Sequence, residues 1–412
     1  MKILVLAPQP FYQERGTPIA VRLLLRALSE RGDEVDLLTF AEGDHVDLPG
    51  LAIERIAPRP DFRPIKPGFS FKKVYCDLFL ARKLSRMLAQ KRYDVVHATE
   101  ESVFFAQFEC RRAGIPYVYD MDSSMSGQIA DRFPWTRWLT PFFRRVEASA
   151  MRSARVVVPM CEALADLARR ERVERLFVLK DVSLIPDDEV EMPVQTGETG
   201  VLDLRSSLSI GAGPLILYIG NLEPYQGIDL LLESFSIARA SLPESTGVVL
   251  IGGSDRDVQK YRERVIELGL ESQVHLIGPQ PVGLVAPYMK QADLLVSPRT
   301  QGENTPMKVY TYLDSGVAVL ATDLPTHRQV VDSSQSGLAP PEPEPFAAEM
   351  VRLLQSPSLR EELAVEAKAL IEREHSYPVF AKRVQHLYNW VEHGGVLTEP
   401  IEAEIPAPRM KV

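Results

Sequence analysis

Short apolar runs alternate with amphipathic segments along most of the chain. The first run, residues 2–6, is too short for the apolar core of a signal peptide, so we expect it to form a buried strand. The patterns predict further strands at residues 34–39, 51–56, 94–97, 117–119, 155–158, 215–219, 248–251, 274–276, 293–296 and 318–322. They predict helices at residues 19–30, 70–90, 102–112, 142–152, 161–170, 228–240, 256–268, 284–291 and 307–315, and a long pair at the C-terminal end. Strands that alternate with helices form parallel sheets with helices on both faces, so we expect the α/β class.

A polar stretch with little periodicity divides this pattern into two. The chain has 412 residues, which favours two domains over one. We predict an N-terminal domain at 1–185, a linker at 186–212, a second domain at 213–376, a terminal helix at 377–395 that packs back on the first domain, and a disordered tail at 396–412. Ligands bind outside the carboxyl ends of parallel strands, so we expect a cleft between the two domains to hold the site.

Cysteine content and charge limit the classes of protein to which this chain can belong. The three cysteines are widely spaced and form neither a disulfide framework nor a metal motif, which predicts a cytoplasmic protein and no metal site. Residues 1–200 contain 29 basic and 29 acidic side chains, whereas residues 201–412 contain 18 and 27. This balance argues against a nucleic-acid partner. Residues 59–92 hold ten basic side chains against Asp61 and Asp77, which suits an anionic acceptor or the inner face of an anionic membrane.

The most informative motif spans residues 302–308, Gly-Glu-Asn-Thr-Pro-Met-Lys, between an expected strand and an expected helix. We interpret Thr305 as the helix N-cap and Pro306 as the first helical residue, and we interpret Thr17 and Pro18 in the same way after the first strand. A helix N-terminus presents free N–H groups and a positive dipole to anions. The carboxylate of Glu303 can hold sugar hydroxyls, and the amine of Lys308 can hold phosphate. The motif therefore predicts a nucleotide-sugar site.

Other candidate residues follow expected strands elsewhere in the chain. Small or polar residues at such positions form phosphate-facing loops or a flat slot for a base, although ordinary tight turns explain them as well. On the donor side these residues are Gly16, Thr17, Gly220, Asn221, Gln226, Gly252, Ile277, Gly278, Arg299, Asn304, Thr305 and Thr311. His97, Glu101 and Asp122 are candidates on the acceptor side. A single histidine is more often structural than catalytic, and that alternative stays open for His97.

These segments together resemble the family-4 retaining glycosyltransferases of the GT-B fold, formerly called group 1. The resemblance runs from the first strand to about residue 393 and is most specific at 218–235 and 274–331. It implies two Rossmann-like domains that face a central cleft. It also implies transfer of a hexose from a nucleotide-diphosphate sugar, with retained configuration and with neither metal nor cofactor. The acceptor is then a glycan or a lipid-linked molecule, as in polysaccharide biosynthesis.

The chain departs from the family pattern at four positions. Asn221 stands where the family has arginine, Gln226 where it has lysine and Thr311 where it has a second glutamate. Asp122 stands where many relatives have histidine. The usual cations are therefore missing, and either Lys308 with Arg299 replaces them or transfer activity has been lost. We favour replacement, because a cation in the first helical turn opposes the dipole by about 0.3–1 kcal/mol unless an anion binds there.

We expect Glu303, which matches a glutamate of the family, to act in catalysis together with Lys308, Asp122 and His97. Three rival hypotheses stay open: an inactive glycosyltransferase-like scaffold, a nucleotide-sugar epimerase of the same architecture, and a membrane-surface binder. The sequence leaves the base, the sugar, the acceptor and the oligomeric state undetermined.

Overall fold

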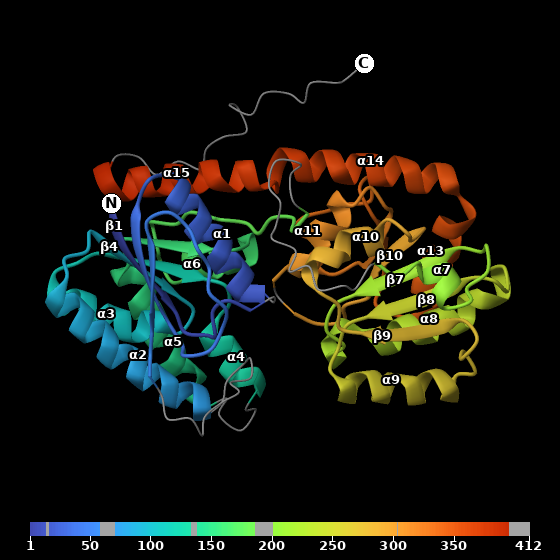
Figure 1. Ribbon diagram of the computed structural model, residues 1–412, viewed down its shortest axis with the longest axis horizontal. Coiled ribbons are helices and arrows are strands. Elements are labelled where there is room, and N and C mark those ends of the chain that lie inside the picture. The colour runs from blue at the N-terminus through green and yellow to red at the C-terminus, as the bar shows by residue number, and fades with distance from the viewer. Residues whose placement is uncertain (14–15, 58–70, 133–137, 186–200, 303, 395–412) are drawn as a thin grey trace, which may run out of the picture. The chain divides into compact units, whose positions relative to one another are not determined.

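The computed structural model describes residues 1–13, 16–57, 71–132, 138–185, 201–302 and 304–394. The chain divides into two compact units (Figure 1). Unit 1 comprises Met1–Asp181 with Pro378–Val412, and unit 2 comprises Val182–Tyr377. The predicted tail at 396–412 and residues 186–200 of the predicted linker lie outside the described residues. The remainder of that linker contains a short helix, α7 (Leu204–Ser207), whose Leu204 is buried in the core of unit 2.

Unit 1 contains a six-stranded parallel sheet in the order β3-β2-β1-β4-β5-β6. Its strands are β1 (Lys2–Ala7), β2 (Glu34–Thr39), β3 (Leu51–Arg55), β4 (Val95–Thr99), β5 (Tyr117–Met121) and β6 (Val156–Pro159). Each lies where the apolar runs predict a strand. β1, β4 and β6 are almost entirely buried, as expected for strands covered on both faces. Chain order reverses between β1 and β4, which makes that pair the switch point of the sheet.

The helices of unit 1 cover both faces of this sheet (Figure 1). They are α1 (Gly16–Glu30), α2 (Phe71–Gln90), α3 (Ser102–Ala113), α4 (Met125–Arg132), α5 (Thr140–Ser153), α6 (Glu162–Arg170) and α15 (Tyr377–His393). The sequence patterns missed α4, which is held by a distant side chain. The carboxylate of Glu147 on α5 accepts the backbone N–H of Met125 at 2.8 Å and the hydroxyl of Ser126 at 2.6 Å. That buried carboxylate caps the start of α4.

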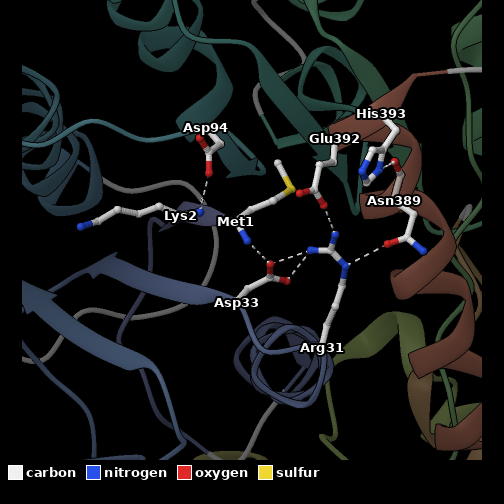
Figure 2. Close-up of polar contacts among 8 residues, drawn as sticks. All are labelled: Met1, Lys2, Arg31, Asp33, Asp94, Asn389, Glu392 and His393. Atoms are coloured by element: carbon white, nitrogen blue, oxygen red, sulfur yellow. Dashed lines mark hydrogen bonds and ion pairs between the residues drawn. The ribbon is translucent and has the colours of Figure 1, made fainter.

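An ion-pair cluster that is buried at Asp33 and exposed at Glu392 fastens α15 to the body of unit 1 (Figure 2). The guanidinium of Arg31 donates to both carboxylate oxygens of Asp33, at 2.6 and 2.7 Å. It also contacts Glu392 and the side-chain oxygen of Asn389, both on α15. The side chain of Asp33 is only 1% exposed, so its charge depends on these partners and on the amino group of Met1. Arg31 therefore joins the turn after α1 to the terminal helix.

Replacing Arg31 with alanine is expected to lower the free energy of unfolding by about 1–3 kcal/mol, because Asp33 then loses hydrogen bonds while staying buried. The matched control is Arg169→Ala, since Arg169 pairs with Glu162 and Asp166 at the exposed surface of α6. That change is expected to cost less than about 1 kcal/mol. Urea denaturation of the two variants checks the difference, and equal losses would contradict the role given to Arg31.

Unit 2 repeats the architecture with a parallel sheet in the order β12-β11-β10-β7-β8-β9. Its strands are β7 (Leu215–Ile219), β8 (Gly247–Ile251), β9 (Val274–Gly278), β10 (Leu294–Ser297), β11 (Val319–Thr322) and β12 (Gly337–Ala339). Five of these strands lie where the sequence predicts them. β12 has three residues, too few for a period of two to be visible, and the patterns missed it. The switch point lies between β7 and β10.

The two faces of this second sheet are covered by two groups of helices and two hydrophobic clusters. The chain forms α7, α8 (Ile228–Ala238), α9 (Asp255–Glu267), α10 (Val285–Met289), α11 (Met307–Asp314), α12 (Pro325–Arg328), α13 (Pro343–Gln355) and α14 (Pro357–Glu374), with 3-10 turns η3 (Pro224–Gln226), η4 (Arg239–Ser241) and η5 (Val282–Leu284). One cluster includes residues of α8, α9 and α13, and the other includes residues of α10, α11 and α14. The four-residue α12 was not predicted.

No helix within the described residues combines the length and the apolar character that crossing a bilayer requires. The three cysteines, Cys76, Cys110 and Cys161, are free thiols buried in unit 1.

Candidate functional site

The central feature of unit 2 is a group of polar side chains at the carboxyl ends of β7 and β10, the switch point of the sheet. Tyr218 is the fourth residue of β7, and the loop after it carries Gly220, Asn221 and Gln226. Arg299 follows β10 by two residues. Lys308 lies in the first turn of α11 and reaches the same place.

The amine of Lys308 is held by neutral partners. Its Nζ donates to the hydroxyl of Tyr218 at 2.8 Å and to Oε1 of Gln226 at 2.8 Å. The same nitrogen lies 4.0 Å from the centroid of the Tyr218 ring. The Tyr218 hydroxyl in turn donates to the carbonyl of Asn221. In the part of the chain that the structure describes, no carboxylate lies within ion-pair distance of Lys308.

These surroundings make the positive charge of Lys308 costly in the absence of an anion. Desolvation lowers the pKa of the Lys308 amine well below its ordinary value, and the nearby charge of Arg299 lowers that pKa further. An anion bound against the amine would raise the pKa again. The side chain as a whole is half-buried, and its amine is held against the buried side chains of Tyr218 and Gln226. The arrangement is therefore suited to a ligand that brings its own negative charge.

Arg299 fixes the loop that precedes α11. Its guanidinium donates to the carbonyl of Gln301, to the carbonyl of Asn304 at 3.1 Å and to Oδ1 of Asn304 at 3.3 Å. It also lies over the ring of Tyr225, 5.3 Å from the centroid. The pKa of Arg299 is lowered, mainly by desolvation. Arg299, a predicted donor-site cation, thus uses three hydrogen bonds to hold its own loop. Its positive charge also acts on Lys308.

His327 is fully buried and contacts residues at the ends of β10 and β11, next to this loop. Its Nδ1 lies 2.7 Å from the carbonyl of Thr322, which can only accept, so this nitrogen donates; in a neutral ring Nε2 then accepts the Ser297 hydroxyl at 2.9 Å. The hydroxyl of Thr322 donates to the carbonyl of Arg299 at 2.6 Å. Burial lowers the pKa of His327 to about 4. The ends of β10 and β11 are therefore joined through an imidazole that must stay uncharged.

This lowered pKa predicts a loss of stability in acid. A base whose pKa is lower in the folded protein than the usual 6.5 stabilises the fold above pH 6.5 and loses that contribution as pH falls towards 4. Between pH 7.5 and pH 5 the loss is about 2 kcal/mol. His327→Gln is expected to remove this part of the pH dependence, whereas His45→Gln, at an exposed position, is expected to retain it. Urea denaturation at the two pH values checks this, and an unchanged pH dependence in His327→Gln would contradict it.

Glycines bring the strand ends of unit 2 close together. The N–H of Gly220 donates to the carbonyl of Ile251, and the N–H of Gly252 donates to the carbonyl of Gly278. A Cβ at Gly252 would lie 2.0 Å from the carbonyl oxygen of Gly220, and Gly252 has φ +119. The predicted base slot at Gly252, Ile277 and Gly278 therefore consists of three strand ends in backbone contact, with Ile277 half-buried at the end of β9.

The predicted N-caps are wrong at both helix starts. Pro306, with φ −65 and ψ 129, is the N-cap of α11, and the buried hydroxyl of Thr305 donates to the carbonyl of Thr326 at 2.7 Å. In unit 1 the helix begins at Gly16, two residues earlier than a Thr17 cap allows. Thr17 donates to Glu100 at 3.3 Å instead. Both hydroxyls found partners distant in sequence, which the local pattern could not reveal.

Two further candidates have internal partners. His97 was expected at the acceptor side, but its ring is completely buried: Nε2 lies 3.1 Å from Asp120, and Nδ1 lies 2.8 Å from the hydroxyl of Tyr388 on α15. It joins β4, β5 and α15 within unit 1. Thr311 was expected to contact donor hydroxyls, but it is 5% exposed and its oxygen accepts the N–H of Leu184. Glu303 lies outside the described residues.

The remaining acceptor-side candidates lie at the carboxyl edge of the sheet in unit 1. Asp122 follows β5 and is half-buried, and Glu101 follows β4 and contacts Lys73. Desolvation raises the pKa of Asp122 well above its ordinary value, and the charges of Asp120, Glu100 and Asp181 raise it further. Among the described residues, none forms a hydrogen bond or an ion pair with Asp122. Burial and the neighbouring negative charges therefore both disfavour the charged form of this carboxyl group.

Sequence reasoning missed Tyr218, Tyr225 and His327 as members of the site. Tyr218 and Tyr225 lie in the 218–235 stretch of the family resemblance without being site candidates, and His327 is not a candidate either. The one signal that could have found Tyr218 is its place two residues before Gly220, at the end of a strand that borders the switch point.

Comparison with known proteins identifies the two halves separately. Residues 203–370 match the model of glycosyl transferases group 1, and residues 15–179 match that of the glycosyl transferase 4-like domain. The two models together span both units. Unit 2 therefore belongs to the group 1 glycosyltransferases, and unit 1 to the glycosyl transferase 4-like domains. The resemblance seen in the sequence is thereby confirmed at the level of the family.

Among curated proteins, this glycosyltransferase is similar to the phosphatidyl-myo-inositol mannosyltransferase of Mycolicibacterium smegmatis, with 23% identity over 96% of this chain and 95% of the relative. It is also similar to the alpha-D-kanosaminyltransferase of Streptomyces kanamyceticus, with 22% identity over 74% of this chain and 79% of that protein.

Solved structures share the fold of this glycosyltransferase. Anabaena HepE in complex with UDP has a TM-score of 0.72 and 16% identity, covering 94% of this chain and 100% of HepE. Sucrose-phosphate synthase from Thermosynechococcus elongatus has a TM-score of 0.74 and 17% identity, covering 96% of this chain and 100% of that one. At these identities the likeness confirms the α/β fold of two parallel-sheet units.

Proposed function

We propose that this glycosyltransferase moves a hexose from a nucleotide-diphosphate sugar to a hydroxyl of a glycan or lipid-linked acceptor, with the configuration retained. The observation that carries the proposal is the Lys308 amine: it lies at the switch point of unit 2, in the first turn of a helix, without a carboxylate partner among the described residues. A diphosphate supplies the negative charge that such an amine lacks. The names of the relatives, which include a mannosyltransferase, support a sugar donor.

The proposed mechanism assigns each group one task. The N–H groups in the first turn of α11 and the amine of Lys308 hold the diphosphate and stabilise the charge that develops on it as the bond to the sugar carbon breaks. The acceptor oxygen forms the new bond to that carbon from the same face, and its proton passes to the departing phosphate oxygen. Arg299 fixes Asn304 beside the same helix start. Glu303 keeps its predicted role at the sugar hydroxyls.

The same assignment predicts that no metal ion is needed. The charge of the diphosphate is met by Lys308, by the start of α11 and by the field of Arg299. Transfer is therefore expected to persist at an unchanged rate in the presence of EDTA. Loss of activity on chelation, restored by a divalent cation, would contradict this part of the proposal.

A panel of UDP, GDP and ADP sugars tests the function directly. Calorimetry is expected to show binding of at least one donor, and incubation of that donor with glycan and lipid-linked acceptors is expected to release the nucleoside diphosphate. Absence of binding to every donor would favour an inactive scaffold. Conversion of a donor to its epimer without any acceptor would favour an epimerase.

We also propose that unit 1 contacts anionic membranes through α2. Val74, Leu78, Arg82 and Arg86 are exposed and four residues apart, which places two apolar and two basic side chains along one helix face. The rest of the predicted basic stretch, residues 58–70, lies outside the described residues. Sedimentation with vesicles that contain anionic lipid is expected to retain the protein at low salt and release it at high salt. Equal binding to neutral vesicles would contradict an electrostatic contact.

A further inference from the structure

Gln226 and Lys308 meet end to end at the switch point of unit 2. Gln226 is the last residue of η3 and is 6% exposed, and its Oε1 lies 2.8 Å from Nζ of Lys308. The amine is the donor in this contact, so the Gln226 amide presents its oxygen to it. The two side chains come from segments that are 82 positions apart in the sequence.

The partners of Lys308 are themselves fixed in place. The hydroxyl of Tyr218 donates its proton to the Asn221 carbonyl, which leaves a lone pair for Lys308. The turn that carries Gln226 is closed by a hydrogen bond from its own N–H to the carbonyl of Glu223. Gly227 then approaches the carbonyl of Pro298 so closely that a Cβ would lie 1.8 Å from that oxygen. The amide oxygen of Gln226 therefore has little freedom, and neither has the amine it accepts from.

Within the described part of the chain, the side chains around the contact between Gln226 and Lys308 include no anion that would stabilise a second amine there. Arg299 faces it from the loop after β10, Tyr225 from η3, Tyr218 from β7 and His327 from α12. None of these four side chains is an anion at neutral pH. A second ammonium at the same place would repel the first, and a bound diphosphate would relieve that repulsion.

We propose that Gln226 is a positioning residue for the donor diphosphate, and that Gln226 and Lys308 form an exchangeable pair in which one amine meets one amide oxygen. This inference rests on the proposed function. A lysine side chain is one bond longer than a glutamine side chain, about 1.5 Å. Lysine at 226 and glutamine at 308 would therefore place the amine close to its present position, with the amide oxygen now supplied from α11.

The test compares Lys308→Gln, Gln226→Lys and the double exchange by calorimetry with UDP, GDP and ADP. Lys308→Gln is expected to weaken binding of the preferred diphosphate by on the order of 100-fold. Gln226→Lys places two amines together, so its binding is expected to depend on pH more steeply than that of the wild type. The double exchange is expected to recover at least about ten-fold of the affinity lost in Lys308→Gln, a coupling that independent residues do not show.

Two results would overturn the pairing. The first is a double exchange that melts like the wild type but binds diphosphate no better than Lys308→Gln. The second is a Gln226→Met variant that binds with unchanged affinity, because methionine fills the space without the oxygen. Either result leaves the proposed function intact as long as the wild type binds a diphosphate. A wild type that binds none of the three nucleotides would instead refute the proposed function, and the pairing with it.

Discussion

Replacing Lys308 with methionine is expected to lower the rate of sugar transfer by on the order of 100-fold or more. Methionine keeps most of the volume of the side chain but removes the charge that meets the leaving diphosphate. The hydroxyl of Tyr218 and the amide of Gln226 also lose their common donor. The wild-type amine has a lowered pKa in the free protein, so binding an anion there is expected to take up a proton and to weaken as pH rises.

The matched control for this change is Lys368→Met on α14, since Lys368 is exposed. Its transfer rate is expected to stay within about two-fold of the wild-type rate, in keeping with a surface substitution away from the site. Steady-state kinetics with the preferred donor compares the two variants. A Lys308→Met enzyme that transfers sugar at the wild-type rate would show that the diphosphate is held elsewhere.

Replacing Gly252 with alanine is expected to abolish donor binding and to destabilise unit 2. The added Cβ would lie 2.0 Å from the carbonyl oxygen of Gly220, and the φ of +119 is one that L side chains rarely adopt. Overpacking of this kind costs about 1–3 kcal/mol, and an unfavourable positive φ adds about 1–2 kcal/mol. The displaced loop carries Asn221 and ends at Gln226, so the contacts of Lys308 are expected to be lost as well.

Gly269→Ala is the control for backbone conformation alone. Gly269 also has positive φ, +63, but no atom lies within 4 Å of the added Cβ. Its cost is expected to be limited to about 1–2 kcal/mol of conformational strain, with donor affinity unchanged. Urea denaturation and calorimetry measure both quantities. Equal losses in the two variants would show that the close approach of Gly252 and Gly220 has no part in the site.

The fold was predictable because most of its strands are buried on both faces. Runs such as residues 2–6 and 215–219 must be covered by helices wherever they lie, so the alternation along the chain specifies parallel sheets. The elements that escaped prediction depend on distant partners or are very short. α4 is capped by Glu147 from α5, and β12 has only three residues.

The sequence could predict a site residue only where its position after a strand is enough to place it in the fold. Lys308 and Arg299 were placed at a strand end by the sequence, and the structure brings them to the same switch point. Their partners could not be predicted, because the contacts of Lys308 with Tyr218 and Gln226 join residues 90 and 82 positions apart. For the same reason the partner of the Thr305 hydroxyl, the carbonyl of Thr326, was invisible in the local N-cap pattern.

Calorimetric titration of wild type and Lys308→Met with the preferred nucleoside diphosphate and with the matching nucleoside tests the central claim most directly. If the Lys308 amine holds the diphosphate, the variant is expected to bind the diphosphate on the order of 100-fold more weakly and the nucleoside with unchanged affinity. Equal affinity of both proteins for the diphosphate would contradict the claim.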